Sequence, residues 1–215
     1  ALSDSTYIIA AVALSIGVVI GFAIGRVRAV SKENRGEAAV RRRLTLAFKG
    51  YGYHLLNNVT MPYQDGTTQI DHVLVARSGV FVIESKHFTG WIFGDSTSPM
   101  WTQVIYRTKR RFQNPLRQNL KHLAAVRELL DFLPPENIHS VVVFTGDAKF
   151  KTPRPNGVLH LGELVGSISE FTENVMSQNR MEFCVGRIEA RRRLISGRTD
   201  VEHMAYLDRK FGRAD

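Results

Sequence analysis

An uncharged run near the beginning of the chain limits the fold most strongly. Residues 7–25 contain no Asp, Glu, Lys or Arg, and most of their side chains are apolar. A helix needs about 20 such residues to cross the roughly 30 Å hydrocarbon core of a bilayer. We therefore expect a short N-terminal segment (1–6) and one transmembrane helix (7–25), which leaves about 190 residues for a separate domain.

The charges around this run predict its orientation. Only Asp4 precedes it, whereas four basic residues follow it closely: Arg26, Arg28, Lys32 and Arg35. Positive flanks favour the cytoplasmic side, so we expect the N-terminus outside and the chain from residue 26 onward in the cytoplasm. A cleavable signal peptide would carry its positive charges first, so an uncleaved signal-anchor is the better interpretation.

Small residues lie on one stripe of the expected membrane helix. Gly17, Gly21 and Gly25 follow one another at four-residue spacing. Such a stripe lets two membrane helices approach closely and favours a homodimer. The alternative is that Gly is common in membrane helices generally.

The whole chain is basic, with 29 Lys and Arg against 20 Asp and Glu, a formal charge of +9 and a pI near 10.0. This excess points to a polyanionic partner, either nucleic acid or anionic lipid. We assign the linker (26–34) to lipid and a second cluster, which has no acidic neighbour between 101 and 121, to nucleic acid: Arg107, Lys109, Arg110, Arg111, Arg117 and Lys121. The single cysteine, Cys184, excludes an intramolecular disulfide and a zinc finger or ribbon.

Apolar periodicity and turn signals predict an α/β domain with one mixed sheet and helices on both faces. Strands are expected at 53–60, 67–76, 80–86, 101–106, 138–145 and 157–161, and helices at 36–51, after Asn114-Pro115, and at 163–177 and 187–213. Leu120 and Leu123 mark the inner side of the helix after Asn114-Pro115. We expect the domain to cover 35–165 and a basic helical extension to cover 166–215.

Two acids and a lysine meet in the hairpin formed by the second and third strands. A turn centred on Ser78-Gly79 would pair Asp71 with Lys86 and place Glu84 beside them, since side chains alternate between the two faces. A salt bridge would explain Asp71 and Lys86, but it leaves the second carboxylate unexplained. His72 and His87 point to the opposite face, where we expect them to pack or to contact the residues that hold the metal.

Glu37 adds a third acid, three residues before Val40 on the apolar side of the first helix. An acid in a first helical turn is common for other reasons. Clustered carboxylates repel one another unless a cation lies among them. Oxygen ligands, without clustered Cys or paired His, favour Mg²⁺ or Mn²⁺ over zinc. A metal beside a lysine on a basic domain indicates metal-assisted phosphodiester hydrolysis.

These residues resemble the Asp…Glu-x-Lys core of the PD-(D/E)XK nuclease superfamily, and most closely its NERD (nuclease-related domain) branch. The similarity spans about residues 36–145. Its matching pieces are Gly36-Glu37, Gln69-Ile70-Asp71-His72, Val82-Ile83-Glu84-Ser85-Lys86, Gly90, Trp101, Asn114-Pro115-Leu116 and Gln118-Asn119.

The resemblance implies a restriction-endonuclease-like αβββαβ core. It implies that Asp71 and Glu84 bind the metal together with the backbone carbonyl of Ser85. Lys86 would be the catalytic lysine, and Glu37 would complete the metal or water site.

The resemblance also implies that Gln69 and Gln118 are accessory polar residues near the substrate. The leading hypothesis is a membrane-anchored, Mg²⁺- or Mn²⁺-dependent nuclease acting on DNA or RNA at the cytoplasmic face. The alternatives are a non-catalytic, membrane-tethered module that binds nucleic acid or lipid, and a membrane scaffold. Five aromatic residues near basic ones could stack bases or pack in the core: Trp91, Phe93, Trp101, Tyr106 and Phe112.

Overall fold

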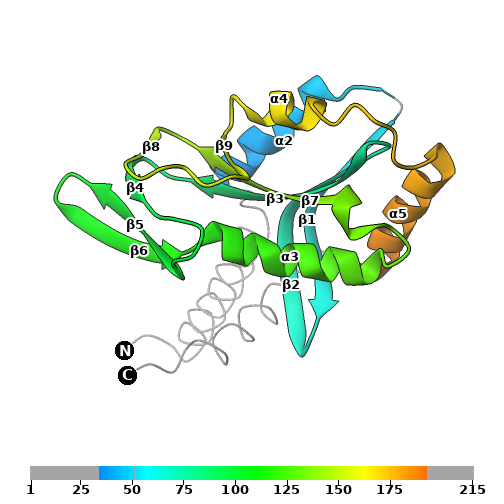
Figure 1. Ribbon diagram of the computed structural model, residues 1–215, viewed down its shortest axis with the longest axis horizontal. Coiled ribbons are helices and arrows are strands. Elements are labelled where there is room, and N and C mark those ends of the chain that lie inside the picture. Colours follow the sequence, from blue (N-terminus) through cyan, green and yellow to red (C-terminus); the bar gives the residue numbers. More distant parts are fainter. Residues whose placement is uncertain (1–33, 51, 193–215) are drawn as a thin grey trace, which may run out of the picture. The chain divides into compact units, whose positions relative to one another are not determined.

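The computed structural model describes residues 34–50 and 52–192 (Figure 1). The expected N-terminal segment, membrane helix, glycine stripe and most of the linker lie outside these residues, as does the end of the basic extension. Within the described part of the chain, no helix is long and apolar enough to cross a bilayer. The described residues all belong to one compact unit.

Five strands form the main sheet, in the order β1–β2–β3–β7–β9. β1, β2 and β3 are antiparallel neighbours, whereas β3, β7 and β9 run parallel. Their bounds are Tyr53–Tyr63 for β1, Gly66–Ala76 for β2, Gly79–His87 for β3, Ile138–Thr145 for β7 and Val158–His160 for β9. β7 is nearly continuous in apolar residues because it is buried on both faces.

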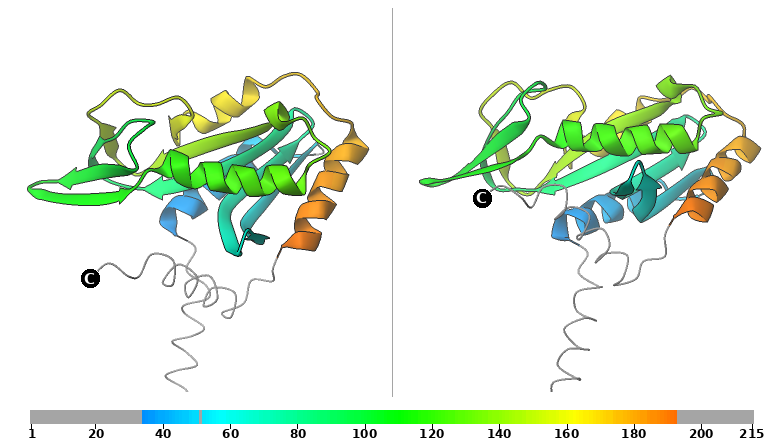
Figure 2. Two further views of the ribbon diagram at one scale, coloured as in Figure 1. Left: turned by 60° about the horizontal axis from the view of Figure 1, so that its bottom comes forward. Right: turned by 90° about the horizontal axis from the view of Figure 1, so that it is seen from below.

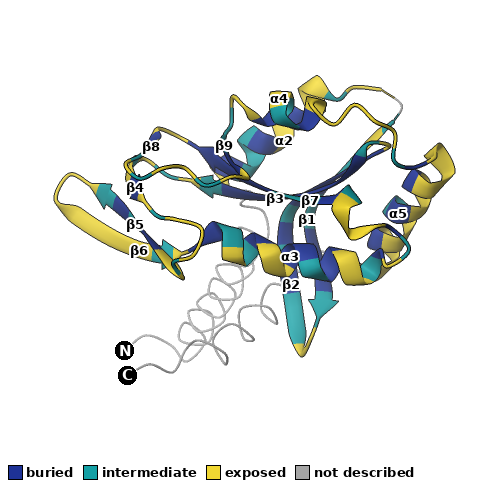
Figure 3. Ribbon diagram, viewed as in Figure 1, coloured by how far each residue is buried: buried dark blue, intermediate teal, exposed yellow. Residues whose placement is uncertain are grey.

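Helices cover both faces of this sheet, as the sequence predicts for a mixed α/β fold. Val40 and Leu44 of α2 (Arg35–Ala47) pack with Phe81 and Ile83 on one face, together with α4 (Leu164–Ser169). On the other face, α3 (Pro115–Leu129) and α5 (Gln178–Arg191) enclose a second cluster of apolar side chains. A short 3₁₀ turn, Pro135–Asn137, leads from α3 into β7. Figure 3 shows the buried strands between these helices.

A second sheet corrects the prediction of one sheet only. Its order is β6–β5–β4–β8, with bounds Gly90–Phe93 for β4, Met100–Ile105 for β5, Thr108–Gln113 for β6 and Ala148–Phe150 for β8. Ile92 and Trp101 anchor it on Val142 and Phe144 of the main sheet. The sequence concealed it because β4 and β8 are very short and β6 is mostly polar. The β5–β6 hairpin projects from the body (Figure 2).

The C-terminal helices also differ from the prediction. The helix expected over 163–177 ends at Ser169, and α5 begins at Gln178 rather than at 187. Met181, Cys184 and Ile188 of α5 are fully buried in the α3-side cluster because they recur every three or four residues on one face. The boundary drawn at 165 therefore does not coincide with a break in the packing.

Candidate active site

The β2–β3 hairpin brings the two predicted acids together, in a register that differs from the expected one. Ala76 pairs with Gly79 across a two-residue turn, so Val73 lies opposite Val82 instead of Glu84. The turn begins one residue earlier than expected, which moves the pairing by two residues. Because two is the period of a strand, a shift by two does not by itself move any side chain to the other face.

Asp71 lies where the regular alternation of β2 is interrupted. The pairing of β2 with β3 ends at His72 and Ile83. Beyond it, Ile70 packs in the same α3-side cluster as Val73, although the two are three residues apart. The Asp71 carboxylate makes hydrogen bonds at the point where the β2–β3 pairing ends. Its Oδ2 accepts them from the backbone N and the Oγ of Ser85, each at 2.8 Å.

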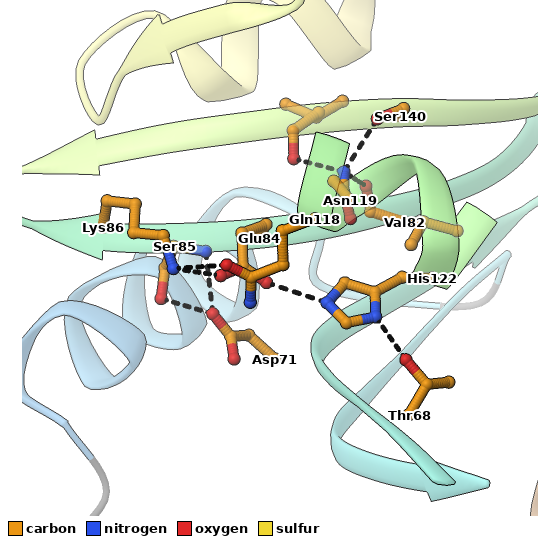
Figure 4. A network of polar contacts seen from close by, with 11 residues as sticks. Thr68, Asp71, Val82, Glu84, Ser85, Lys86, Gln118, Asn119, His122 and Ser140 are labelled. Carbon is orange, nitrogen blue, oxygen red and sulfur yellow. Dashed lines mark hydrogen bonds and ion pairs between the residues drawn. The ribbon is translucent and has the colours of Figure 1, made fainter. Parts of the chain in front are cut away.

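Glu84 is the most deeply buried member of the cluster, with 2% of its side chain exposed. Its Oε1 accepts a hydrogen bond from Lys86 Nζ at 2.5 Å. Its Oε2 lies 3.2 Å from Nε2 of His122, on α3 (Figure 4). Both oxygens of this buried carboxylate therefore face nitrogen atoms of the chain.

Helix α3 closes the cluster from above the sheet. Asn114 caps it by accepting a hydrogen bond from Leu116 N at 2.9 Å, and Pro115 occupies its first turn. One turn later, Gln118 Oε1 accepts a hydrogen bond from Lys86 Nζ at 3.0 Å. The expected accessory residue Gln118 thus lies next to the expected catalytic lysine.

Asn119 holds α3 against the main sheet through hydrogen bonds to two strands. Its Nδ2 lies 2.9 Å from Val82 O on β3 and 3.1 Å from Val141 O on β7. It also lies 2.8 Å from Ser140 Oγ. A fully buried amide that binds both strands explains why this Asn is part of the sequence pattern.

The two carboxyl groups have opposite pKa shifts. Burial and the neighbouring Glu84 carboxylate raise the pKa of Asp71 from 3.8 to about 6, against the Ser85 hydrogen bonds, which lower it. Burial alone would raise the pKa of Glu84, but His122 and Lys86 outweigh it and hold that pKa below its usual value. Negative charge is thus well compensated at Glu84 and poorly compensated at Asp71.

Glu37 lies in the first turn of α2, and Gln69 lies two residues before Asp71 on β2. Gly36, beside Glu37, lies so close to the ends of β3 and β7 that a Cβ would come within 2.8 Å of His87 and Thr145. Yet α2 packs on the face opposite to α3. Gln69 follows Thr68, whose side chain points to α3, so Gln69 turns to the other face. The roles of Glu37 and Gln69 stay predictions.

The predicted basic cluster lies at the surface. Arg107 and the lysine and arginines of β6 are exposed on the projecting β5–β6 hairpin, and Arg117 and Lys121 are exposed on α3. Arg117 donates a hydrogen bond to Thr97 O at 2.6 Å.

His122 is the site residue that the sequence analysis missed. It lies four residues after Gln118, and it is 5% exposed, whereas the expected inner residue Leu120 is 55% exposed. Its Nδ1 lies 2.6 Å from Thr68 Oγ1, which fixes the ring against Glu84. The i,i+4 spacing of Gln118 and His122, beside the buried Asn119, is the signal that could have revealed it.

Comparison with known proteins agrees with this geometry. The model of the nuclease-related domain, NERD, matches residues 32–145, from the start of α2 to the end of β7. The chain belongs to the NERD family. An uncharacterized protein of Bacillus anthracis is 33% identical to this chain over 187 residues, which are 85% of this chain and 86% of that protein. No solved structure matches.

The residues present suit a hard divalent cation, although the set of protein ligands is small. The NERD motif offers the carboxylates of Asp71 and Glu84, and the poorly compensated charge of Asp71 favours a cation beside it. Among the described residues, no group of three Asp, Glu, His or Cys side chains is placed to hold a metal. Mg²⁺ tolerates this, because it commonly keeps several waters and binds through one or two carboxylates.

Proposed function

We propose that this NERD protein is a metal-dependent nuclease that hydrolyses phosphodiester bonds of DNA or RNA. The observation that carries the proposal is the cluster of Asp71, Glu84 and Lys86 around Ser85 at the end of β3. Placing a partly buried carboxylate next to a fully buried one is unfavourable for folding, so a role in chemistry explains them better than a structural role.

Asp71, Glu84 and the Ser85 backbone carbonyl would hold Mg²⁺ or Mn²⁺. The ion, when bound, supplies a Lewis acid for the phosphate and lowers the pKa of a water. Lys86 Nζ lies between Glu84 and Gln118, and 19% of its side chain is exposed, so it can meet a substrate phosphate. His122 holds Glu84 from the far side, and Gln118 holds Lys86.

We further propose a single-pass membrane anchor at residues 7–25, with the domain in the cytoplasm. The support is the uncharged run, followed by basic residues and preceded by none. The stripe of Gly17, Gly21 and Gly25 supports a homodimer within the membrane. Protease treatment of sealed cells tests the orientation: we expect the domain to be protected, and digestion from outside would contradict it.

The test of the nuclease is incubation of the full chain, in mild detergent, with single- and double-stranded DNA and RNA. Each substrate is combined with Mg²⁺, Mn²⁺ or EDTA. We expect cleavage of at least one substrate with a divalent ion and none in EDTA. Cleavage of none of them with either ion would contradict the proposal.

A non-catalytic module that binds nucleic acid or lipid is the second candidate. It is favoured by the way the cluster closes on itself, since both Glu84 oxygens face Lys86 and His122. Such a module would show salt-sensitive binding in the assay above but no turnover.

A further inference from the structure

The second sheet has one face toward the core and one toward solvent. Along β4, Trp91 is 49% exposed and Phe93 36% exposed, whereas Ile92 between them is fully buried. Along β5, Trp101 is fully buried and Met100 is 38% exposed. Successive side chains of a strand alternate between faces, so Trp91 and Phe93 lie on the outward face. Two exposed aromatic rings on one sheet face call for an explanation.

Basic side chains share this outward face. The register across β4, β5 and β6 puts Lys109 in one row with Trp91, and Arg111 in one row with Phe93. On the other side of β4, Lys149 of β8 pairs with Trp91. The four strands of this sheet contain no Asp or Glu. The face therefore combines aromatic rings with uncompensated positive charge.

Trp91 borders a hollow near the turn of the β5–β6 hairpin. The hollow has a volume of about 510 Å³ and is lined by Val104, Ile105 and Tyr106 as well as by Trp91. Lys151 Nζ lies 4.6 Å from the centre of the Trp91 ring, a cation–π contact that steadies the ring. A flat apolar wall beside positive charges suits a nucleobase with its phosphate.

We propose that the outward face of the second sheet binds single-stranded nucleic acid, with bases stacking on Trp91 and Phe93. Lys109 and Arg111 would contact the phosphates. In a duplex the faces of the bases are covered by their neighbours, so exposed rings on a sheet gain contacts only from unpaired bases. The absence of acids on these four strands favours a polyanion over a protein partner.

The position of this sheet in the chain connects it to the candidate active site. β4 begins four residues after Lys86, and β6 leads through Asn114 into α3, which carries Gln118. A nucleic-acid strand bound to the second sheet would therefore be held by the segments that flank Lys86 and Gln118 in the chain. The inference that this strand is the substrate rests on the proposed nuclease function, whereas the binding itself does not.

Binding of the full chain to fluorescein-labelled DNA, measured by fluorescence anisotropy in EDTA, tests the proposal without cleavage. The probes are a single strand of about 20 nucleotides and its duplex, long enough for one such site. We expect the double variant Trp91→Ala/Phe93→Ala to lose about fivefold or more per ring on the single strand, and to keep its duplex affinity. Lys109→Gln/Arg111→Gln should weaken both.

Phe183→Ala is the matched control, because Phe183 is 53% exposed on α5, outside this sheet, and should leave both affinities unchanged. Trp91→Phe, which keeps a ring, should retain most of the single-strand affinity. Equal losses on both probes, or no loss on the single strand, would overturn the proposal. The proposal would also be overturned if the chain bound no single strand but bound anionic vesicles, and if Trp91→Ala/Phe93→Ala lost that vesicle binding.

The same variants separate this proposal from the nuclease proposal. A chain that binds single strands through Trp91 and Phe93 but cleaves nothing would refute the nuclease and leave this surface intact. A chain that cleaves with Mg²⁺ while its single-strand affinity ignores both rings would keep the nuclease and refute this surface.

Discussion

Asp71 Oδ2 accepts two hydrogen bonds from Ser85, one from its backbone N and one from its Oγ, both at 2.8 Å. The carboxylate thereby satisfies a backbone donor at the point where β2 stops pairing with β3. An amide oxygen could accept the same two bonds. The charge is therefore not needed for the fold, and burial makes it unfavourable.

Replacing this charge should stabilise the metal-free chain. The pKa of Asp71 rises from 3.8 to about 6 on folding, so the folded state binds the proton more tightly. Stability is then lost as the pH rises from about 4 to about 6, and the loss is complete above the folded pKa. We expect Asp71→Asn to be more stable than the wild type at pH 8, by at most about 3 kcal/mol, and to gain little at pH 3.5.

Urea unfolding of both chains in EDTA at the two pH values measures this difference. Asp131→Asn is the matched control, because 74% of the Asp131 side chain is exposed. Its free energy of unfolding should stay within about 0.5 kcal/mol of the wild type. A wild type that is more stable than Asp71→Asn at pH 8 would show that the carboxylate is structural.

The close approach of α2 to the ends of β3 and β7 depends on the absence of a side chain at Gly36. A Cβ at Gly36 would lie 2.7 Å from Thr145 Oγ1 and 2.8 Å from His87 Cβ, so Gly36→Ala should destabilise the domain by about 1–3 kcal/mol. Gly186, in α5, has nothing within 4 Å of its Cβ position, and Gly186→Ala should stabilise by up to about 1 kcal/mol. Thermal unfolding compares the two, and equal melting temperatures would refute the close approach of α2.

His122 should act as a positioning residue. His122→Ala leaves Thr68 Oγ1 and Glu84 Oε2 buried without the ring between them, which should destabilise the chain by about 2–3 kcal/mol. It should also lower the rate of cleavage by releasing Glu84, with little effect on nucleic-acid affinity. His54→Ala, which removes an exposed partner of Glu182, is the control and should change neither quantity much. Wild-type rate and stability in His122→Ala would contradict this role.

The β2–β3 hairpin shows how far the sequence can predict this site. Alternation along β3 places Glu84 and Lys86 on one face whatever the register, and the turn shifted the pairing by an even number of residues. The interruption of β2 at Asp71 is different. It coincides with Asn58 on β1, whose φ is 51°; Asn adopts positive φ more readily than most residues, but an Asn within a strand does not by itself predict one.

The inner face of α3 shows where prediction fails. Leucines set the expected face, but Leu120 is exposed and the buried positions include Asn119 and His122. Burial of these polar side chains is favourable only because β3, β7 and Thr68 supply their partners, and those contacts are remote in sequence. The second sheet was not predicted for a similar reason. Its short strands are stabilised by packing on β7 rather than by the apolar pattern of their own sequence.

Neutralising the basic residues of the β5–β6 hairpin should reduce the salt dependence of nucleic-acid binding. Each phosphate contact changes the slope of log affinity against log salt by about 0.9 on duplex and 0.7 on single strands. The triple variant Lys109→Gln/Arg110→Gln/Arg111→Gln should therefore flatten the slope by about two to three units. Arg42→Gln/Arg43→Gln on α2 is the exposed control. An unchanged slope, together with lost flotation on anionic liposomes, would assign the hairpin to the membrane.

The most direct test of the central claim is the rate of Mg²⁺-dependent cleavage by Glu84→Gln. This substitution keeps the size of the side chain and removes the buried charge that Lys86 and His122 surround. Glu163→Gln is the control, because Glu163 pairs with Arg154 at the surface, 2.7 Å away, and takes no part in the cluster. We predict that Glu84→Gln loses cleavage by at least about 100-fold while Glu163→Gln cleaves like the wild type. Wild-type, EDTA-sensitive cleavage by Glu84→Gln would contradict the account.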